Sequence, residues 1–338
     1  MPPESRKRKL ARHWSETSWD NVQCNLCPHQ CSVAPSRSGA CGVRSNRDGK
    51  FYVDTYGRIT LREVVGGFQI PLFHYQPGLR WYKVGTKGCT MRCPFCNTYE
   101  YSQLGAKNTL PVTPEEVVEL ARMEECGGLV FGCNEPVVSH EFLIDVFRVA
   151  RKTGLKTALQ TNGTWLEDPF QEVLILTDAF SFGIKGFNTQ EYSNNYGAQL
   201  ESILQNIETA VFQNHHVEIS YLVTTPDPDL AREEFQNFLQ WLTKLDASIP
   251  VVLSGLKPGY LSKVDVSQSV VESLHAEFTG QIHHLYNADA ASYQVNSTFC
   301  PHCGEEVITR TTSGTAVHLN ERKCCPSCGS AVGGFVWK

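Results

Sequence analysis

Strand-like apolar runs alternate with amphipathic segments along the middle of this chain, and that alternation constrains the fold more than any other feature. A threonine-capped segment at Thr113-Pro114-Glu115-Glu116 marks one helix start, with proline at the first helical position. Six β–α units joined by short loops predict an α/β fold, a parallel sheet curled into a partial (β/α)6 TIM-like barrel. We expect the strands at residues 81–86, 129–131, 157–160, 179–184, 217–223 and 251–253.

Polar residues follow each expected strand. In a parallel barrel, the loops that follow the strands hold the reactive residues. In chain order these polar residues are Cys89, Cys93 and Cys96, then Asn134 and Glu135, then Asn162, Lys185, Thr224 and Thr225, and Lys257. Glu135 can accept hydrogen bonds from an ammonium group, and Lys185 can pair with a carboxylate. Those are the two charges of an amino acid such as methionine. Taken singly, Glu135 also fits a helix-start residue, and Lys185 fits a solvated loop lysine.

Three cysteines with C-x3-C-x2-C spacing follow the first expected strand, in Gly88 to Cys96, with Phe95 before the last cysteine. Iron–sulfur clusters are usually held by four thiolates. Three thiolates would leave one iron open to bind and reduce a small molecule. A zinc knuckle and unrelated buried thiols are the alternatives.

Two further cysteine groups flank the repeat, and the chain has 14 cysteines in all. The first group can form a closed zinc site or hold a second iron–sulfur cluster, and the spacing does not decide between them. The second has two C-P-x-C-G knuckles, the pattern of a structural zinc ribbon. The two groups are Cys24, Cys27, Cys31 and Cys41, and Cys300, Cys303, Cys325 and Cys328.

Length and composition point to a multi-part globular protein. The chain has 338 residues, 41% of them hydrophobic, and a net charge of −5, which gives no sign of nucleic-acid binding. We expect no membrane span and no secretory leader, and paired C-x2-C spacings in such a chain favour metals over disulfides. A cytoplasmic protein is therefore expected. The domains are expected at 1–80 (cysteine-rich and β-rich), 81–292 (barrel) and 293–338 (zinc-ribbon-like).

The sequence resembles the AmmeMemoRadiSam family of radical S-adenosylmethionine (radical SAM) proteins, relatives of pyruvate formate-lyase activating enzyme. The resemblance covers nearly the whole chain. It rests on the three-cysteine signature and on further segments: Cys24 to Pro28, Gly39 to Lys50, Pro71-Leu72-Phe73-His74, Asn134-Glu135-Pro136, Thr161-Asn162-Gly163, Ile184-Lys185-Gly186-Phe187 and Thr298 to Gly304.

The resemblance implies a 4Fe–4S cluster on the three central cysteines and SAM bound at its open iron. Reduction would split SAM into methionine and a 5′-deoxyadenosyl radical that abstracts hydrogen from a substrate. The expected cofactor-binding residues are Phe95, Asn134, Glu135, Asn162, Lys185 and Lys257. Among them, Glu135 would bind the SAM amine, Asn162 and Lys185 the ribose or carboxylate, and Phe95 would lie near adenine. Two positions depart from the family pattern. Gly183 stands where an acidic residue is common, and Leu256-Lys257-Pro258 stands where Phe-His-Pro is common.

Three functions fit these observations. The first is a radical SAM enzyme acting on a small molecule or peptide, with an electron donor such as flavodoxin or ferredoxin. The second is an activase that installs a glycyl radical on a partner enzyme. The third is a non-catalytic metal-binding adaptor, which would be indifferent to SAM.

Overall fold

An eight-stranded sheet forms the centre of the protein in the computed structural model, which describes residues 9–103, 109–290, 296–311 and 314–332. Its strand order is β16-β15-β14-β13-β12-β11-β9-β8, and every neighbouring pair is parallel except β8 with β9. The strands are β8 Leu61–Gly66, β9 Arg80–Gly85, β11 Gly128–Phe131, β12 Lys156–Thr161, β13 Ala179–Lys185, β14 His216–Val223, β15 Val251–Gly255 and β16 Leu285–Asn287.

All six strands expected from the sequence are present, so the α/β prediction is confirmed. Two strands were missed. The β16 strand extends the parallel order by one, and β8 adds an antiparallel edge from a segment expected to belong to the N-terminal layer.

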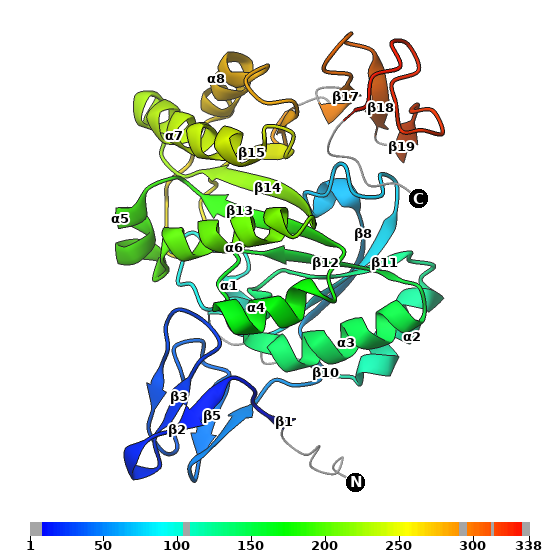
Figure 1. Cartoon of the computed structure of the whole chain (residues 1–338). Coiled ribbons are helices and arrows are strands. Elements are labelled where there is room, and N and C mark those ends of the chain that lie inside the picture. The colour runs from blue at the N-terminus through cyan, green and yellow to red at the C-terminus, as the bar shows by residue number, and fades with distance from the viewer. Residues whose placement is uncertain (1–8, 104–108, 291–295, 312–313, 333–338) are drawn as a thin grey trace.

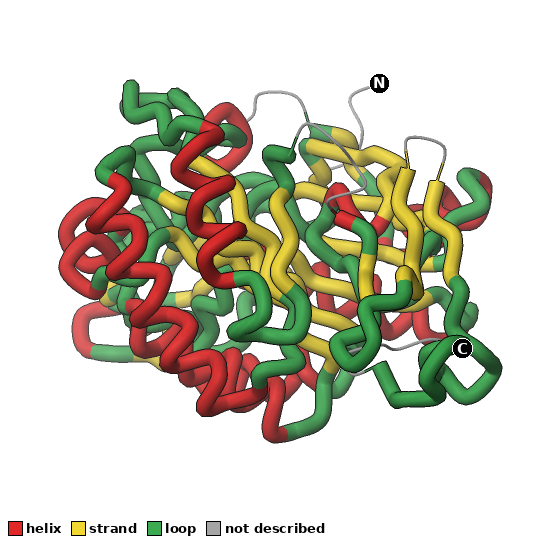
Figure 2. The backbone as a smooth tube through the Cα atoms, turned by 90° about the horizontal axis from the view of Figure 1, so that it is seen from above, coloured by secondary structure: helices red, strands yellow, loops and turns green. Residues whose placement is uncertain are grey.

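Helices cover one face of this sheet, as Figures 1 and 2 show. The Thr113 capping box is present: its hydroxyl accepts from the Glu116 amide at 3.2 Å, and its own amide donates to the Glu116 carboxylate at 2.6 Å. No helix in the described ranges is long and apolar enough to cross a bilayer. The longer helices are α2 Pro114–Met123, α3 His140–Lys152, α4 Glu167–Leu174, α6 Leu200–Phe212, α7 Pro228–Asp246 and α8 Gln268–Phe278. The short ones are α1 Tyr99–Ser102 and α5 Thr189–Glu191.

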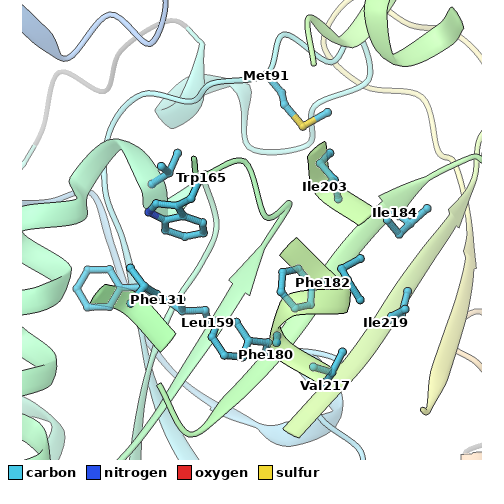
Figure 3. Packing of buried hydrophobic residues seen from close by; sticks show 14 of the residues in the cluster. Met91, Phe131, Leu159, Trp165, Phe180, Phe182, Ile184, Ile203, Val217 and Ile219 are labelled. Carbon is cyan, nitrogen blue, oxygen red and sulfur yellow. The ribbon is translucent and has the colours of Figure 1, made fainter. Parts of the chain in front are cut away.

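The core lies between the sheet and these helices (Figure 3). Along β13, Phe180, Phe182 and Ile184 are fully buried in it, and the rings of Phe180 and Phe182 stack at 5.3 Å. Because side chains alternate along a strand, the intervening Ser181 and Lys185 point to the opposite face. Burial of each large apolar side chain contributes about 1.5–3 kcal/mol, and here it also fixes which residues face the sheet's inner side.

The N-terminal region forms small antiparallel sheets beneath the central one (Figure 1). Two of these sheets have three strands each, in the orders β2-β3-β4 and β1-β6-β5, and β7 pairs with β10. The strands are β1 Lys9–Leu10, β2 Trp14–Glu16, β3 Val22–Cys24, β4 Ser32–Val33, β5 Arg44–Arg47, β6 Lys50–Val53, β7 Arg58–Ile59 and β10 Leu110–Pro111.

The C-terminal tail adds a three-stranded antiparallel sheet of β17 Thr298–Phe299, β18 Glu306–Thr311 and β19 Gly314–Val317. Arg310 joins it to the rest of the protein. Its guanidinium donates to the carbonyls of Phe73 and Asn296, each at 2.6 Å, and lies over the Phe73 ring. The Phe73 segment is held in turn by buried Glu218, whose carboxylate accepts the Phe73 amide at 2.6 Å.

Candidate active site

A cavity of about 450 Å³ opens at the carboxyl ends of the parallel strands. This volume lies in the range of small-molecule sites in proteins. Nine of the expected residues line it: Cys89, Cys93, Phe95, Cys96, Asn134, Glu135, Asn162, Lys185 and Lys257. Thr224 and Thr225, expected after the fifth strand, do not. Residues separated by up to 168 positions in the chain therefore meet at one site, as parallel strand topology predicts.

The cysteine loop begins with Gly88, whose backbone requires glycine. Its φ is +90°, and a Cβ there would lie 2.7 Å from Val43 Cγ1 and 2.8 Å from the Cys41 carbonyl oxygen. Asn134 holds the loop from the other side, because its Nδ2 donates to the Gly88 carbonyl at 2.7 Å and its Oδ1 accepts from the Thr86 amide at 2.9 Å. Asn134 thus positions the loop, since its side-chain amide is already engaged within the protein.

The three thiols of the loop are largely withdrawn from water. Burial raises the pKa of Cys89, and the Glu135 carboxylate raises it further. Burial also raises the pKa of Cys93, against the opposing charge of Lys185. The Cys96 sulfur lies 3.1 Å from the Ser102 hydroxyl. Buried thiols of this kind lose their protons readily only to a bound cation, so the donor set suits a metal group.

The spacing of these three sulfurs suits a group with several metal atoms. Within the described part of the chain, two groups of side chains have ligand atoms that all lie within 4.8 Å of one another, but these three sulfurs do not form such a group. At least two of them are therefore farther apart than 4.8 Å. A single zinc would draw its sulfurs to about 3.8 Å apart, given Zn–S bonds of about 2.3 Å in a tetrahedron. Sulfurs that surround a cavity at wider spacing fit an iron–sulfur cluster, in which each thiolate binds a different iron.

Glu135 is fully buried on the wall of the cavity. Its carboxylate accepts from the Thr161 hydroxyl at 2.5 Å, from the Asn162 amide at 2.7 Å and from Asn162 Nδ2 at 2.8 Å. Burial raises the pKa of Glu135, while those hydrogen bonds and the Lys185 charge act in the opposite direction. The carboxylate is therefore oriented by the protein and can accept a further charged donor from the cavity.

Lys185 and Asn162 face each other across the same wall, with Lys185 Nζ donating to Asn162 Oδ1. The Lys185 backbone amide donates to the Tyr192 hydroxyl at 2.7 Å, which fixes the end of β13. Gly183 leaves this pair open to the cavity: a Cβ there would lie 3.4 Å from Asn162 Oδ1 and 3.6 Å from Lys185 Nζ. Because Gly183 carries no acidic side chain, Lys185 is the charged residue that β13 places at the cavity.

Phe95 and Lys257 lie at the rim with different roles. Phe95 is buried and packs edge-on against Tyr196, with ring centroids 5.2 Å apart. Lys257 turns its ammonium outward, where Nζ donates to Asp265 Oδ1 at 3.2 Å and to the Val266 carbonyl at 3.0 Å. Its side chain is 57% exposed, so it is a weaker cofactor-binding candidate than Lys185.

A set of polar side chains within the strands was missed from the sequence. These residues line the cavity from the inner face of the sheet: Lys83, Gln160, Ser181, Ser220 and Ser254. Within the described part of the chain, the buried Ser181 hydroxyl and Gln160 Oε1 have no hydrogen-bond partner. Buried polar atoms are normally paired, so these two are available to a ligand. Their alternation with the apolar residues of each strand is the sequence signal that they share, but it marks a polar face without showing that this face lines a site.

The N-terminal cysteines line a second cavity. Cys24, Cys27, Cys31 and Cys41 surround it. Burial raises the pKa of Cys24 to about 11 and that of Cys27 to about 12. The structure therefore brings the four predicted ligands together at one place.

The C-terminal cysteines form a tighter group. All four sulfurs, those of Cys300, Cys303, Cys325 and Cys328, lie within 4.8 Å of one another. The Cys300–Cys328 and Cys303–Cys325 sulfur distances are 3.7 and 3.6 Å. These distances match the edges of a tetrahedron around one zinc, about 3.8 Å, and the donor set fits that metal.

The profile of the radical SAM superfamily matches residues 84–242, which include the three-cysteine loop, Glu135, Asn162 and Lys185. This chain carries a radical SAM domain. It is therefore an enzyme, of a superfamily that works with a 4Fe–4S cluster and SAM, and this speaks against the non-catalytic adaptor. The finer resemblance to the AmmeMemoRadiSam family stays a prediction.

Relatives of this chain include uncharacterized protein MJ0808 of Methanocaldococcus jannaschii, 27% identical over 93% of this chain and 95% of that protein. Pyruvate formate-lyase 1-activating enzyme of Escherichia coli K12 is 30% identical over 153 residues, 44% of this chain and 62% of that enzyme. The chain thus spans less than two thirds of the activating enzyme.

The solved structures that match part of this chain share little sequence with it. SuiB of Streptococcus suis bound to S-adenosylmethionine has a TM-score of 0.48 and 11% identity, covering 61% of this chain and 48% of SuiB. Native anSMEcpe with bound AdoMet has a TM-score of 0.46 and 14% identity, covering 67% of this chain and 70% of that chain.

Proposed function

We propose that this protein is a radical SAM enzyme that cleaves SAM reductively at a 4Fe–4S cluster held by Cys89, Cys93 and Cys96. The single observation that supports it most is the convergence of those cysteines with Glu135 and Lys185 on one cavity. When bound, the cluster supplies the electron that splits SAM into methionine and a 5′-deoxyadenosyl radical, which abstracts hydrogen from a small-molecule or peptide substrate. A ferredoxin or flavodoxin would be the electron donor.

The protein's own residues would bind and orient SAM. Glu135 would accept the ammonium of the methionyl group, because its carboxylate is buried and aligned by three donors. Lys185 and Asn162 would contact the carboxylate or ribose, and Phe95 would lie against adenine. The partial barrel would keep water from the reacting atoms, and the polar strand residues at its floor would face the second substrate.

Two structural proposals accompany this function. The central sheet, open between β8 and β16 in its pairing order, would be the partial barrel of the domain. The four C-terminal cysteines would hold one structural zinc, with Arg310 docking the resulting ribbon against Phe73.

The test is anaerobic reconstitution with iron and sulfide, reduction, addition of SAM and assay for 5′-deoxyadenosine. We expect that product, and we expect Cys93→Ala to remove both the cluster absorption and the product. Cys126→Ala is the matched control, because Cys126 is buried outside the cavity. A fully loaded cluster that yields no 5′-deoxyadenosine would refute the proposal.

A glycyl-radical-enzyme activase is the second candidate. It is favoured by the named activating enzymes among the relatives and by the open cavity, which no described residue of the tail lines. It predicts that a glycine-containing peptide loop is the substrate. Transfer of deuterium from such a labelled peptide into 5′-deoxyadenosine would support it over a small-molecule substrate.

A further inference from the structure

The four N-terminal cysteines form a site of their own, between the small β-sheets and the central domain. Cys24 ends β3, Cys27 and Cys31 lie in the turn before β4, and Cys41 precedes β5. The cavity between them is closed by apolar groups of Leu26, Phe51 and Val138. Besides the four sulfurs, the lining contains the His29 imidazole, whose Nδ1 lies 3.8 Å from Cys27 Sγ, and the Arg44 guanidinium, which is already paired with Glu141. It contains no carboxylate.

The spacing of these sulfurs differs from that of the zinc-type site in the same protein. At the tail, the sulfurs of Cys300 and Cys328 approach to 3.7 Å, and all four ligands lie within 4.8 Å of one another. Within the described residues, the four N-terminal cysteines do not gather in that way, although they line one cavity. In this respect they match the three cysteines of the active-site loop.

A single zinc and a multi-iron cluster demand different spacings. Zinc at the centre of a sulfur tetrahedron draws the sulfurs to about 3.8 Å. A cluster binds each thiolate through a separate iron, so its four sulfurs stand farther apart around a filled space. We propose that Cys24, Cys27, Cys31 and Cys41 hold a second iron–sulfur cluster rather than zinc.

The position of this site next to the active-site loop gives the proposal a second consequence. Thr90 lines the N-terminal cavity, while its neighbours Cys89 and Met91 line the active-site cavity. The loop is thus the wall between the two cavities, and Gly88 packs directly on the Cys41 backbone. Two paramagnetic clusters at these places would be close enough for their electron spins to interact.

The proposal does not require SAM cleavage, so its test is separate from that of the proposed function. The variant Cys89→Ala/Cys93→Ala/Cys96→Ala removes the active-site thiolates and leaves the N-terminal ones. After anaerobic reconstitution with iron and sulfide, we expect it to retain about four irons per chain and an EPR signal on reduction that SAM does not change. Zinc in place of iron at this stage, or no metal beyond the tail, would overturn the proposal.

A second variant guards against misfolding of the first. Cys27→Ser in the otherwise intact chain should lower the iron content from about eight to about four per chain, and should sharpen the EPR signal of the remaining cluster. An unchanged iron content would overturn the inference. If both clusters load and no 5′-deoxyadenosine forms, the proposed function fails and this inference stands.

Discussion

Arg44 of β5 and Glu141 of α3 form a two-pronged ion pair at the junction between the N-terminal sheets and the central domain. Their nitrogen–oxygen distances are 2.8 and 2.6 Å, and both side chains are about 1–2% exposed. The same Glu141 carboxylate accepts the Arg12 backbone amide at 2.6 Å. Arg44 also lines the cavity of the N-terminal cysteines. The pair therefore links the position of those cysteines to the start of a core helix.

Glu141→Ala should lower the free energy of unfolding by about 3–5 kcal/mol, because it leaves the Arg44 charge buried without its partner. Urea unfolding followed by circular dichroism measures this. Asp54→Asn, which removes the partly exposed partner of Arg47, is the control and should cost at most about 1 kcal/mol. Arg44→Met combined with Glu141→Leu should recover part of the loss. Equal effects at Glu141 and Asp54 would contradict the assignment.

The pH dependence of stability follows from the same pair. Burial alone would raise the pKa of Glu141, but the charge and hydrogen bonds of Arg44 outweigh it and hold that pKa below its ordinary value. A lowered carboxyl pKa stabilises the folded state above the unfolded pKa, and the gain is lost as pH falls through the folded pKa. Acid unfolding of Glu141→Leu/Arg44→Met should therefore show a shallower slope than that of the native chain.

Glu135→Gln should weaken SAM binding to the cluster-loaded protein. Loss of a hydrogen bond to a charged group costs about 1.5–3 kcal/mol, or roughly 10- to 150-fold in affinity. Calorimetric titration with SAM measures it. Glu119→Gln on the exposed face of α2 is the matched control and should leave affinity unchanged.

The raised pKa of Glu135 also predicts how SAM affinity depends on pH. Since the ionised carboxylate is the form that binds an ammonium, SAM affinity should fall as pH decreases through the Glu135 pKa. The Gln variant should lack this dependence. A Gln variant that binds SAM as the native chain does would exclude Glu135 from the site.

Lys185→Met and Lys257→Met should differ, although both lysines line the cavity. Lys185 Nζ is held over the cavity wall by Asn162, whereas Lys257 Nζ is bonded to Asp265 and the Val266 carbonyl. We expect SAM affinity to fall about tenfold or more at Lys185, which loses a charge-assisted contact, and to change little at Lys257. The same titration decides, and the reverse order would assign the carboxylate contact to Lys257.

The rim of the site could be predicted from sequence because it depends on two local signals. Each apolar run identifies a strand, and the residue after it must lie at the carboxyl edge of a parallel sheet. Glu135 and Lys185 were found in this way before any contact was known. Their actual partners, Thr161 and Asn162, required the register between neighbouring strands.

The floor of the cavity could not be predicted in the same way. Ser181 and Ser220 are single polar residues between apolar neighbours, and such residues are also common in strands that line no binding site. Only closure of the curved sheet makes their face an interior one. Glu218 illustrates the same limit: an acid within a strand reads as solvent-facing, yet it is buried and binds the backbone of Phe73 to Tyr75.

Gly88→Ala should disable the cluster loop. An added Cβ would lie within 2.8 Å of Val43 and the Cys41 carbonyl oxygen, so the loop must shift. Such overpacking costs about 1–3 kcal/mol, in addition to the cost of a positive φ. Gly154 has a similar φ, +81°, but open space around an added Cβ. Comparison with Gly154→Ala therefore separates the steric clash from the cost of the positive φ. Iron retained after reconstitution should fall at Gly88 only, and equal retention in both variants would contradict the packing argument.

Two adjacent cysteines in the tail offer the sharpest matched pair for the zinc site. Cys325 belongs to the group of four sulfurs within 4.8 Å of one another, and Cys324 does not. The Cys324 sulfur lies 3.5 Å from the Arg322 carbonyl. Cys325→Ser should lower bound zinc from about one per chain to none, because a structural site needs all four ligands. Cys324→Ser should leave it bound.

Without the metal, the β17–β19 sheet loses its source of stability and should become sensitive to proteolysis. The central domain has its own core, so it should resist the protease and retain its iron. Elemental analysis together with limited proteolysis measures both effects, and zinc loss in the Cys324 variant would show that the ligand set is wrong.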